Sequence, residues 1–344
     1  MKLLLVDHAC HKKTQSFGFF HRMLEERFDV KTFYYDRHGC CRVPREFLDE
    51  SDWVVFLEFL PWRFRLGIPG KKCLFVPMYD NEWGSVWQWR RLAASGMHVL
   101  SFCGKVAEHA RKCGVPGCRL LDVRFAVAPS KVADLEGDAR RLLIWERGDV
   151  TFEAVKALFA PEDLDEVLVL RHPEEGLRYE AISEGDRANY HVRVAEVGFL
   201  PAEEYRNLVR PYGLVLAPRF KEGIGMSFLE YMAMGKVVIA HDDATMCEAI
   251  AHGRNGWLTD LRHPSRVDVS ALRRIHEEGF DASASYRRWQ EDSIRIHDFL
   301  ESPTAVNMNS AATFGQILRY MLYLIEGARM RMKGEMRFSN GNHA

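Results

Sequence analysis

The stretch LAPRFKEGIGMSFLE, residues 216–230, decides how this chain is interpreted. An apolar run ends before Pro218, Gly223 and Gly225 follow, and residues 226–234 contain no helix breaker and are mostly apolar. This order predicts the end of a strand, a loop and a buried helix. Glycine in the loop lets the backbone approach a ligand closely, because glycine carries no Cβ atom.

The start of the predicted helix is suited to an anion. The first N–H groups of a helix have no partner within the helix, and the aligned peptide dipoles place partial positive charge there. A phosphate group bound at this point would be stabilised by both effects. The residues expected to contact it are Gly223, Gly225, Met226 and Ser227.

Two carboxylates belong to the same stretch. Glu222 precedes the helix, and Glu230 lies ~6 Å along the helix axis from Met226. The neighbours of Glu230 are mainly apolar, which predicts partial burial. A buried carboxylate is costly unless it is hydrogen-bonded, and sugar and ribose hydroxyls would be suitable partners. The alternative is structural, with Glu222 capping the helix and Glu230 paired with a cation.

The run EGIGMSFLEYMAMGKVVIA, residues 222–240, has the form E-x7-E and resembles the donor-binding segment of retaining GT-B glycosyltransferases of family 4. The surrounding order also resembles that family. It comprises GFLP at 198–201, CEAI at 247–250 and GRNGWL at 253–258. The resemblance is good over about residues 141–260 and weak before them.

The resemblance implies an α/β fold of the GT-B type, with two Rossmann-like domains facing a cleft. Residues 1–130 would form the acceptor-side domain and residues 141–305 the nucleotide-sugar domain. Residues 306–344 would add a helix that packs back on the first domain and a basic tail. The implied activity moves a sugar from a nucleoside diphosphate donor to a glycan or lipid-linked glycan, with retention.

The resemblance also implies roles for single residues. Glu222 would bond a hydroxyl of the donor sugar, and Glu230 would bond the ribose. Arg147 matches the family's arginine at the end of a strand. The lysine that usually follows is missing, so Arg219 or Lys221 would replace it on the diphosphate. The alternative for Arg147 is a surface ion pair.

Two candidate residues come from the first half of the chain. His8 and the loop with Lys12 and Lys13 occupy the place of the family's glycine-rich loop, although no glycine pair occurs there. Asp80 follows a predicted strand, and ligands bind at the carboxyl ends of strands in open α/β sheets. We therefore expect Glu222, His8 and Asp80 at the catalytic centre. The alternative for Asp80 is a cap on the helix predicted near Trp83.

Composition supports a globular, two-domain protein. The 344 residues are 47% hydrophobic and 28% charged, and the net charge of −1 gives no global reason to expect nucleic acid as a partner. Strand and helix patterns alternate, which favours a parallel α/β sheet. The expected strands are 3–6, 30–35, 53–57, 73–76, 98–102, 142–145, 167–170, 192–197, 214–216 and 237–240.

No metal site and no cofactor besides the nucleotide-sugar donor are expected. Asp242 and Asp243 are adjacent, which is the wrong spacing for a metal-binding Asp-x-Asp pair, so we expect a loop role. Cys113 and Cys118 frame a Gly-Val-Pro-Gly turn and are interpreted as part of that turn. The family resembled here generally holds the diphosphate without metal.

The C-terminal region has apolar residues at helical spacing from Phe314 to Ile325, followed by Arg329, Arg331 and Lys333. We expect the apolar stripe to pack on the first domain, the alternative being insertion into a membrane. The basic tail would give at most weak, salt-sensitive attraction to an anionic membrane surface. No run of ~20 apolar residues is present, so we expect a cytoplasmic protein, with an acceptor at the inner face of the membrane as one option.

Two other functions remain open at this point. Sugar-nucleotide 2-epimerases share the two-domain fold, but no acid and base residues can be assigned for such a reaction. The missing lysine leaves room for a GT-B-like binding subunit without catalysis. Turnover of nucleotide sugars by the purified chain would separate these two functions from a transferase.

Overall fold

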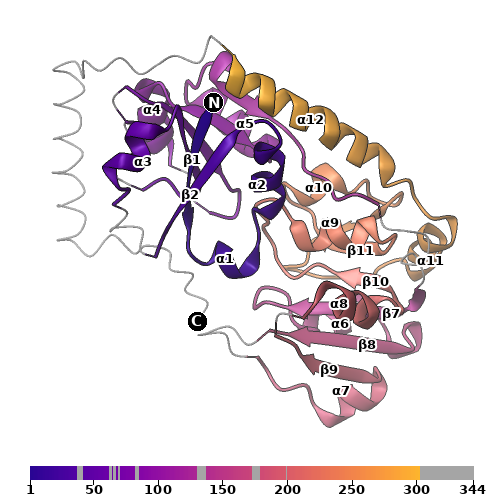
Figure 1. Ribbon diagram of the computed structural model, residues 1–344. Coiled ribbons are helices and arrows are strands. Elements are labelled where there is room, and N and C mark those ends of the chain that lie inside the picture. Colours follow the sequence, from indigo (N-terminus) through magenta and orange to yellow (C-terminus); the bar gives the residue numbers. More distant parts are fainter. Residues whose placement is uncertain are drawn as a thin grey trace, which may run out of the picture. The chain divides into compact units, whose positions relative to one another are not determined.

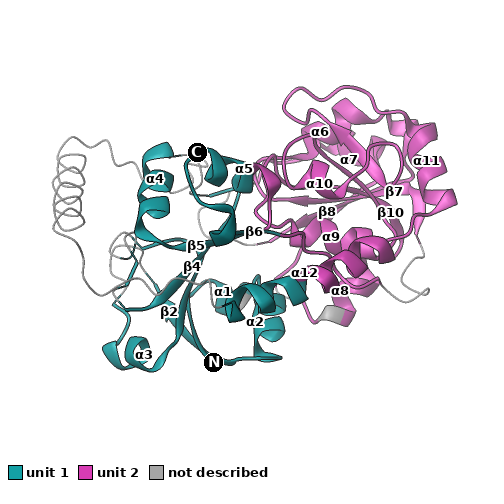
Figure 2. Cartoon of the chain, turned by 90° about the horizontal axis from the view of Figure 1, so that it is seen from above, with its two compact units in different colours: residues 1–101, 106–122, 293–344 teal, residues 102–105, 123–292 magenta. Residues whose placement is uncertain are grey.

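The computed structural model describes residues 1–36, 42–61, 64, 67–68, 70–81, 85–129, 137–172, 179–198 and 200–302. The chain forms two compact units (Figure 2). Unit 1 comprises residues 1–101, 106–122 and 293–344, and unit 2 comprises residues 102–105 and 123–292. The chain passes between the units after residues 101, 105, 122 and 292, whereas the sequence placed the link at about residues 130–141.

Unit 1 contains a six-stranded parallel sheet in the order β2-β1-β3-β4-β5-β6. Its central strands are buried, as continuous apolar runs predict for a parallel sheet covered on both faces. The strands are β1 Lys2–His8, β2 Asp29–Tyr35, β3 Trp53–Glu58, β4 Lys72–Pro77, β5 His98–Ser101 and β6 Leu120–Asp122. The last of these was not predicted, because it has only three residues.

The helices of unit 1 connect consecutive strands (Figure 1). They are α1 His11–Thr14, α2 Gly18–Glu25, α3 Arg45–Glu50, α4 Val86–Ser95, α5 Gly104–Lys112, whose first two residues belong to unit 2, and a 3₁₀ turn Gly117–Arg119. Ser85 caps α4, its hydroxyl accepting the Gln88 N–H at 3.4 Å. The alternative reading of Asp80 as the cap of this helix is therefore wrong.

Unit 2 contains a second six-stranded parallel sheet, in the order β12-β11-β10-β7-β8-β9. Its strands are β7 Asp138–Glu146, β8 Glu166–Arg171, β9 Val192–Glu196, β10 Tyr212–Leu216, β11 Val237–His241 and β12 Gly256–Thr259. The strand β12 was not among the strands expected from the sequence. It pairs with β11, with Trp257 opposite Ile239.

Helices surround this second sheet (Figure 1). They are α6 Phe152–Leu158, a 3₁₀ turn Pro161–Asp163, α7 Glu184–Asn189, α8 Ala202–Val209, α9 Met226–Ala233, α10 Met246–Ala249 and α11 Val269–Glu278. The strand and helix predictions around the stretch 216–230 are confirmed, since β10 ends at Leu216 and α9 begins at Met226.

The long helix α12, Ser283–Glu301, begins in unit 2 and ends in unit 1. Within unit 1, the indole N–H of Trp53 donates to the Leu300 carbonyl at 3.2 Å. The His297 imidazole bonds the Met23 carbonyl at 2.8 Å. The apolar stripe from Phe314 to Ile325 and the basic tail lie outside the described residues. Among the helices of the described chain, none is long and apolar enough to cross a membrane.

Candidate functional site

The loop between β10 and α9 is built around Gly225. This residue has φ +80°, and a Cβ atom added to it would lie 1.9 Å from Cε1 of Phe228. Both the left-handed backbone and the close approach of the ring demand glycine. The loop leaves the carboxyl end of β10, which lies between β11 and β7 in the sheet. The predicted strand, glycine loop and buried helix are therefore present.

The start of α9 is open in the way that an anion site requires. Gly225 is its N-cap, and no side chain in the described chain caps it. The N–H groups of the first turn have no acceptor within the helix, and the positive end of the helix dipole lies there. Met226 and Ser227 are half-buried at this end, while Gly223 is buried. These are the four residues that the sequence assigned to phosphate binding.

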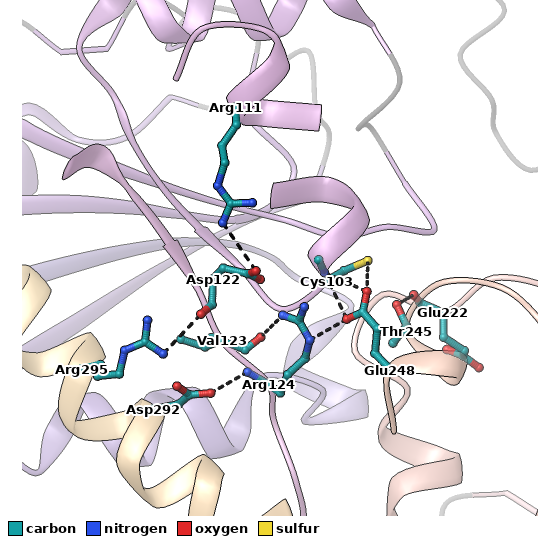
Figure 3. Close-up of polar contacts among 11 residues, drawn as sticks. Cys103, Arg111, Asp122, Val123, Arg124, Glu222, Thr245, Glu248, Asp292 and Arg295 are labelled. Atoms are coloured by element: carbon teal, nitrogen blue, oxygen red, sulfur yellow. Dashed lines mark hydrogen bonds and ion pairs between the residues drawn. The ribbon is translucent and has the colours of Figure 1, made fainter. Parts of the chain in front are cut away.

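Glu222 is half-buried, and its backbone carbonyl accepts a hydrogen bond from the Thr245 hydroxyl at 2.8 Å (Figure 3). Thr245 lies between β11 and α10 and has φ +74° and ψ −57°. This conformation is unusual for a β-branched residue and costs of order 1–3 kcal/mol. The hydroxyl thus ties the loop after β11 to the loop after β10, at the residue that carries the first carboxylate.

Glu230 is more exposed than the sequence predicted. At this helix position the residue points away from the core, into which Leu229 and Tyr231 pack on either side. Loss of water around the carboxyl group nevertheless raises the pKa of Glu230. The hydroxyls of Tyr205 and Tyr231 are hydrogen-bonded to each other, and burial together with the Glu230 charge raises the pKa of both.

The structural alternative for Glu230 also fails. In the described part of the chain no cation forms an ion pair with its carboxylate. The site therefore offers an exposed carboxylate, one turn into α9, that is available to a ligand.

The end of β7 lies beside this loop. The Val150 N–H donates to the Pro218 carbonyl at 3.3 Å, which joins the loop after β7 to the loop after β10. Arg147 is half-buried, with its guanidinium carbon 5.0 Å from the centre of the Trp145 ring. Arg219 is half-buried and Lys221 exposed. The structure thus brings the loops of the three predicted diphosphate-binding cations to neighbouring strand ends.

A buried ion pair that was not predicted supports this edge. Glu146 is 3% exposed, and its two carboxylate oxygens accept from the Phe152 N–H at 2.9 Å and from Arg171 Nε at 2.7 Å. The carboxylate therefore caps α6 and fixes the strand end that precedes Arg147. The signal in the sequence was a charged residue at the end of each of two apolar strands, Glu146 in β7 and Arg171 in β8.

Asp243 has the loop role expected for it. Its carboxylate accepts the Ala244 N–H at 2.8 Å and pairs with Lys105, a residue of unit 2, at 2.9 Å. Glu248, which the sequence assigned no role, accepts the Gly104 N–H at 2.9 Å and pairs with Arg124 at 2.6 Å (Figure 3). These contacts of unit 2 fix the segment that carries Thr245.

The remaining candidates belong to unit 1. His8 ends β1, and its Nδ1 accepts the Cys10 N–H at 3.3 Å while Nε2 lies 3.1 Å from the Asp36 carbonyl. Asp80 is exposed beyond the end of β4. The two strands flank β3, so both residues lie at the carboxyl end of the first sheet.

Three further side chains at this edge, Asp7, His11 and Glu58, were not predicted from the sequence, although they are bonded to one another. His11 Nδ1 lies 2.5 Å from Asp7 Oδ1, and His11 Nε2 lies 2.9 Å from Glu58 Oε2. The spacing of Asp7 and His11, four residues apart directly after an apolar strand, was the available signal. No local pattern pointed to Glu58, because it is 47 positions further along the chain (58 − 11).

Comparison with known proteins gives a family match for the second unit. Residues 145–276 match the family described as glycosyl transferases group 1. A D-inositol 3-phosphate glycosyltransferase from Paenarthrobacter aurescens (strain TC1) is 32% identical over 94 residues. That match spans 23% of this chain and 23% of the relative.

Several solved structures are similar to the chain over most of its length. The HepE protein of Anabaena, crystallised with UDP and glucose, has a TM-score of 0.54 at 14% identity and covers 88% of this chain and 99% of its own. The lipopolysaccharide outer core galactosyltransferase WaaB has a TM-score of 0.55 at 11% identity, with coverage of 88% and 99%. A glycosyltransferase from Rickettsia africae has a TM-score of 0.53 at 14% identity, with coverage of 94% and 97%.

These identities establish the fold alone. The two parallel six-stranded sheets with their helices form the α/β architecture of the GT-B type, as the sequence predicted. Residues 145–276, which match the family of glycosyl transferases group 1, include both Arg147 and the loop from Glu222 to Glu230.

Proposed function

We propose that this chain is a glycosyltransferase that moves a sugar from a nucleoside diphosphate donor to a hydroxyl group of a glycan or lipid-linked glycan. The observation that carries the proposal is the loop before α9, whose conformation requires glycine at position 225. Glu222 lies before the start of this helix and Glu230 one turn after it, and no side chain of the described residues caps that start. That loop lies inside the segment that matches the glycosyltransferase family. The site combines a place for an anion with two carboxylates that can accept hydrogen bonds from hydroxyl groups. A nucleoside diphosphate sugar has the matching parts, because its diphosphate joins a ribose to the donor sugar.

In this proposal the donor binds along the carboxyl end of the second sheet. The diphosphate lies against the first N–H groups of α9, where Arg147 and either Arg219 or Lys221 add positive charge. Glu222 accepts a hydrogen bond from a hydroxyl of the donor sugar, and Glu230 accepts one from a ribose hydroxyl. We take UDP as the first nucleotide to test, because HepE was crystallised with it.

The chemistry proposed is transfer with retention of configuration. The bond from the anomeric carbon to the diphosphate breaks, and the acceptor oxygen bonds the same carbon on the same face. The leaving phosphate takes the proton of the acceptor hydroxyl. The helix start and the cations stabilise the charge that develops on that phosphate, and such preorganised stabilisation is usually the largest contribution to catalysis.

We propose further that the enzyme needs no metal ion, and that it works in the cytosol, where nucleotide sugars are made. Weak contact with an anionic membrane would suit a lipid-linked acceptor. Metal independence is supported by the bonds of Asp243, whose carboxylate is engaged by Lys105 and by a backbone N–H.

The test is to incubate the purified chain with a panel of UDP-sugars and GDP-sugars, with and without excess chelator, and to follow nucleotide release and new products by mass spectrometry. Transfer or hydrolysis of one donor, unaffected by chelator, is expected. Interconversion of two nucleotide sugars would identify an epimerase, and nucleotide binding without turnover would identify a binding subunit. Failure to bind any nucleotide or nucleotide sugar would contradict the proposal as a whole.

A further inference from the structure

The carboxyl end of the sheet in unit 1 holds a connected set of charged and polar side chains. Asp7 comes from β1, Glu58 is the last residue of β3, and Asn81 follows β4. Because β1, β3 and β4 are neighbours in the sheet, these strand ends are adjacent. His11 in α1 joins Asp7 to Glu58, and Asn81 Nδ2 donates to Glu58 Oε1 at 2.9 Å. We call Asp7, His11 and Glu58 the carboxylate–histidine triad.

The geometry around the His11 ring indicates that it is positively charged. Each of its ring nitrogens lies within hydrogen-bond distance of a carboxylate oxygen, at 2.5 Å for Asp7 and 2.9 Å for Glu58. A neutral imidazole has one N–H, so only the imidazolium can donate both bonds. Burial alone would lower the pKa of His11, but the bonds to Asp7 and Glu58 raise it to about 12.

The triad carries a net charge of −1, from two carboxylates and one imidazolium. Asp7 is 1% exposed, and its Oδ1 also accepts the His8 N–H at 2.8 Å. Among the described residues, its Oδ2 has no hydrogen-bond partner. His21 Nε2 lies 4.0 Å from this oxygen, and burial lowers the pKa of His21. Burying carboxylates in excess of cations costs stability, so the arrangement is poorly explained as a stabilising ion pair.

Glu58 is the member of the triad that solvent reaches. Its side chain is 18% exposed, against 9% for His11. Its backbone has φ +61°, a left-handed conformation that is uncommon outside glycine and tends to occur at functional sites. His11 holds one carboxylate oxygen and Asn81 the other, and each oxygen can accept a further hydrogen bond. The result is a fixed, partly open acceptor group.

We propose that Glu58 binds a hydroxyl group of the carbohydrate acceptor, and that His11 and Asp7 are positioning residues that hold its carboxylate. This inference rests on the proposed transferase function and assigns unit 1 a ligand class. A fixed carboxylate in a set of net negative charge selects neutral hydroxyl donors and repels phosphorylated sugars. His8 and Asp80, the unit 1 candidates predicted from the sequence, lie near Glu58. The His8 ring contacts Phe59, which follows Glu58, and Asp80 precedes Asn81, which bonds Glu58.

The test titrates the full chain, in the presence of UDP, with p-nitrophenyl glucosides, galactosides and mannosides and with glucose 6-phosphate. Binding is followed by saturation-transfer NMR, and UDP affinity is measured separately by calorimetry. At least one glycoside is expected to bind the native chain, and glucose 6-phosphate is not. Glu58→Gln should weaken glycoside binding about tenfold or more, while UDP affinity changes less than about twofold. Glu46→Gln, at an exposed carboxylate of α3, is the matched control.

Two outcomes overturn the inference. One is that no glycoside binds the native chain, and the other is that Glu58→Gln binds glycosides as the native chain does. Failure to bind UDP would count against the donor site in unit 2, so the two proposals fail in different titrations.

A second measurement tests the positioning pair without relying on ligand. In chains labelled with ¹⁵N-histidine, His11 should show two protonated ring nitrogens at pH 8, and Glu58→Gln should shift its titration to lower pH. A neutral His11 at pH 8 would contradict the proposed charge of the triad. Asp7→Asn should lower the His11 titration and weaken glycoside binding together, whereas a lowered titration with unchanged glycoside binding would leave Asp7 a purely structural role.

Discussion

The two sheets present different kinds of site at their carboxyl ends. In unit 2 the backbone makes the site, through the left-handed Gly225, the uncapped start of α9 and the strained Thr245. In unit 1 charged side chains make it, through Asp7, His11 and Glu58. A backbone site of this kind suits an anion of fixed shape, such as a diphosphate, whereas a carboxylate site suits hydroxyl donors. The difference fits the donor and the acceptor of the proposed transferase.

The first prediction tests whether backbone shape makes the unit 2 site. Gly225→Ala should lower the free energy of unfolding by about 3 kcal/mol and abolish UDP binding, because the new methyl collides with Phe228 and the residue has φ +80°. Urea denaturation and calorimetry measure both effects. Gly253→Ala is the matched control, since Gly253 has φ +75° but no atom within 4 Å of the added Cβ. Equal losses of unfolding free energy in the two variants would show that backbone strain from the positive φ explains the effect, and that the contact with the Phe228 ring adds nothing.

The second prediction concerns the charge that supports this backbone site. Arg147→Ala should weaken UDP binding by ~1.5–3 kcal/mol, the range of a hydrogen bond to a charged group. Calorimetric titration with UDP measures the change, and uridine, which lacks the diphosphate, provides the control ligand. Unchanged UDP affinity would move the role to Arg219 or Lys221.

The third prediction concerns the charged site of unit 1. The pKa of His11 is about 12 in the folded chain and near 6.5 when unfolded. The folded state therefore keeps a proton that the unfolded state releases above pH 6.5. The stabilisation from this proton is complete below pH 6.5 and is lost progressively as pH rises toward 12.

Stability of the native chain should accordingly fall with pH more steeply than that of His11→Gln, by up to about 1.4 kcal/mol for each pH unit between pH 7 and 9. Urea denaturation at each pH measures the difference between the two slopes. Parallel stability curves for the two chains would mean that His11 is not an imidazolium in the folded state.

The smallest effects are expected at Thr245, where strain and hydrogen bonding oppose each other. Thr245→Gly and Thr245→Ala both remove the hydroxyl, but glycine tolerates φ +74°, so Thr245→Gly should be the more stable of the two by roughly 1 kcal/mol. Thr245→Ser keeps the bond to the Glu222 carbonyl and should exceed Thr245→Ala by about 1 kcal/mol. Equal stability of all three variants would mean that neither the backbone strain nor the hydroxyl of Thr245 contributes to the stability of the loop before α9.

The same contrast explains what the sequence could predict. Glycines, a helix start and two carboxylates stand within nine residues, so the unit 2 loop and its family resemblance were readable locally. The triad was not, because Glu58 joins the local pair of Asp7 and His11 only through the pairing of β1 with β3. The exposure of Glu230 was not predicted for a related reason. Its sequence neighbours Leu229 and Tyr231 are buried, but Glu230 itself faces outward from the helix. Thr245 could not be found, since nothing in the sequence marks a left-handed threonine.

Glu222→Gln tests most directly whether the loop before α9 binds the donor sugar. Sugar transfer or hydrolysis of the donor identified in the nucleotide-sugar panel is measured alongside the affinity for the bare nucleoside diphosphate. Turnover should fall roughly a hundredfold or more, the scale of one lost transition-state contact, while diphosphate affinity stays within about twofold. Equal losses of turnover and of diphosphate affinity, or unchanged turnover, would contradict this role of the loop.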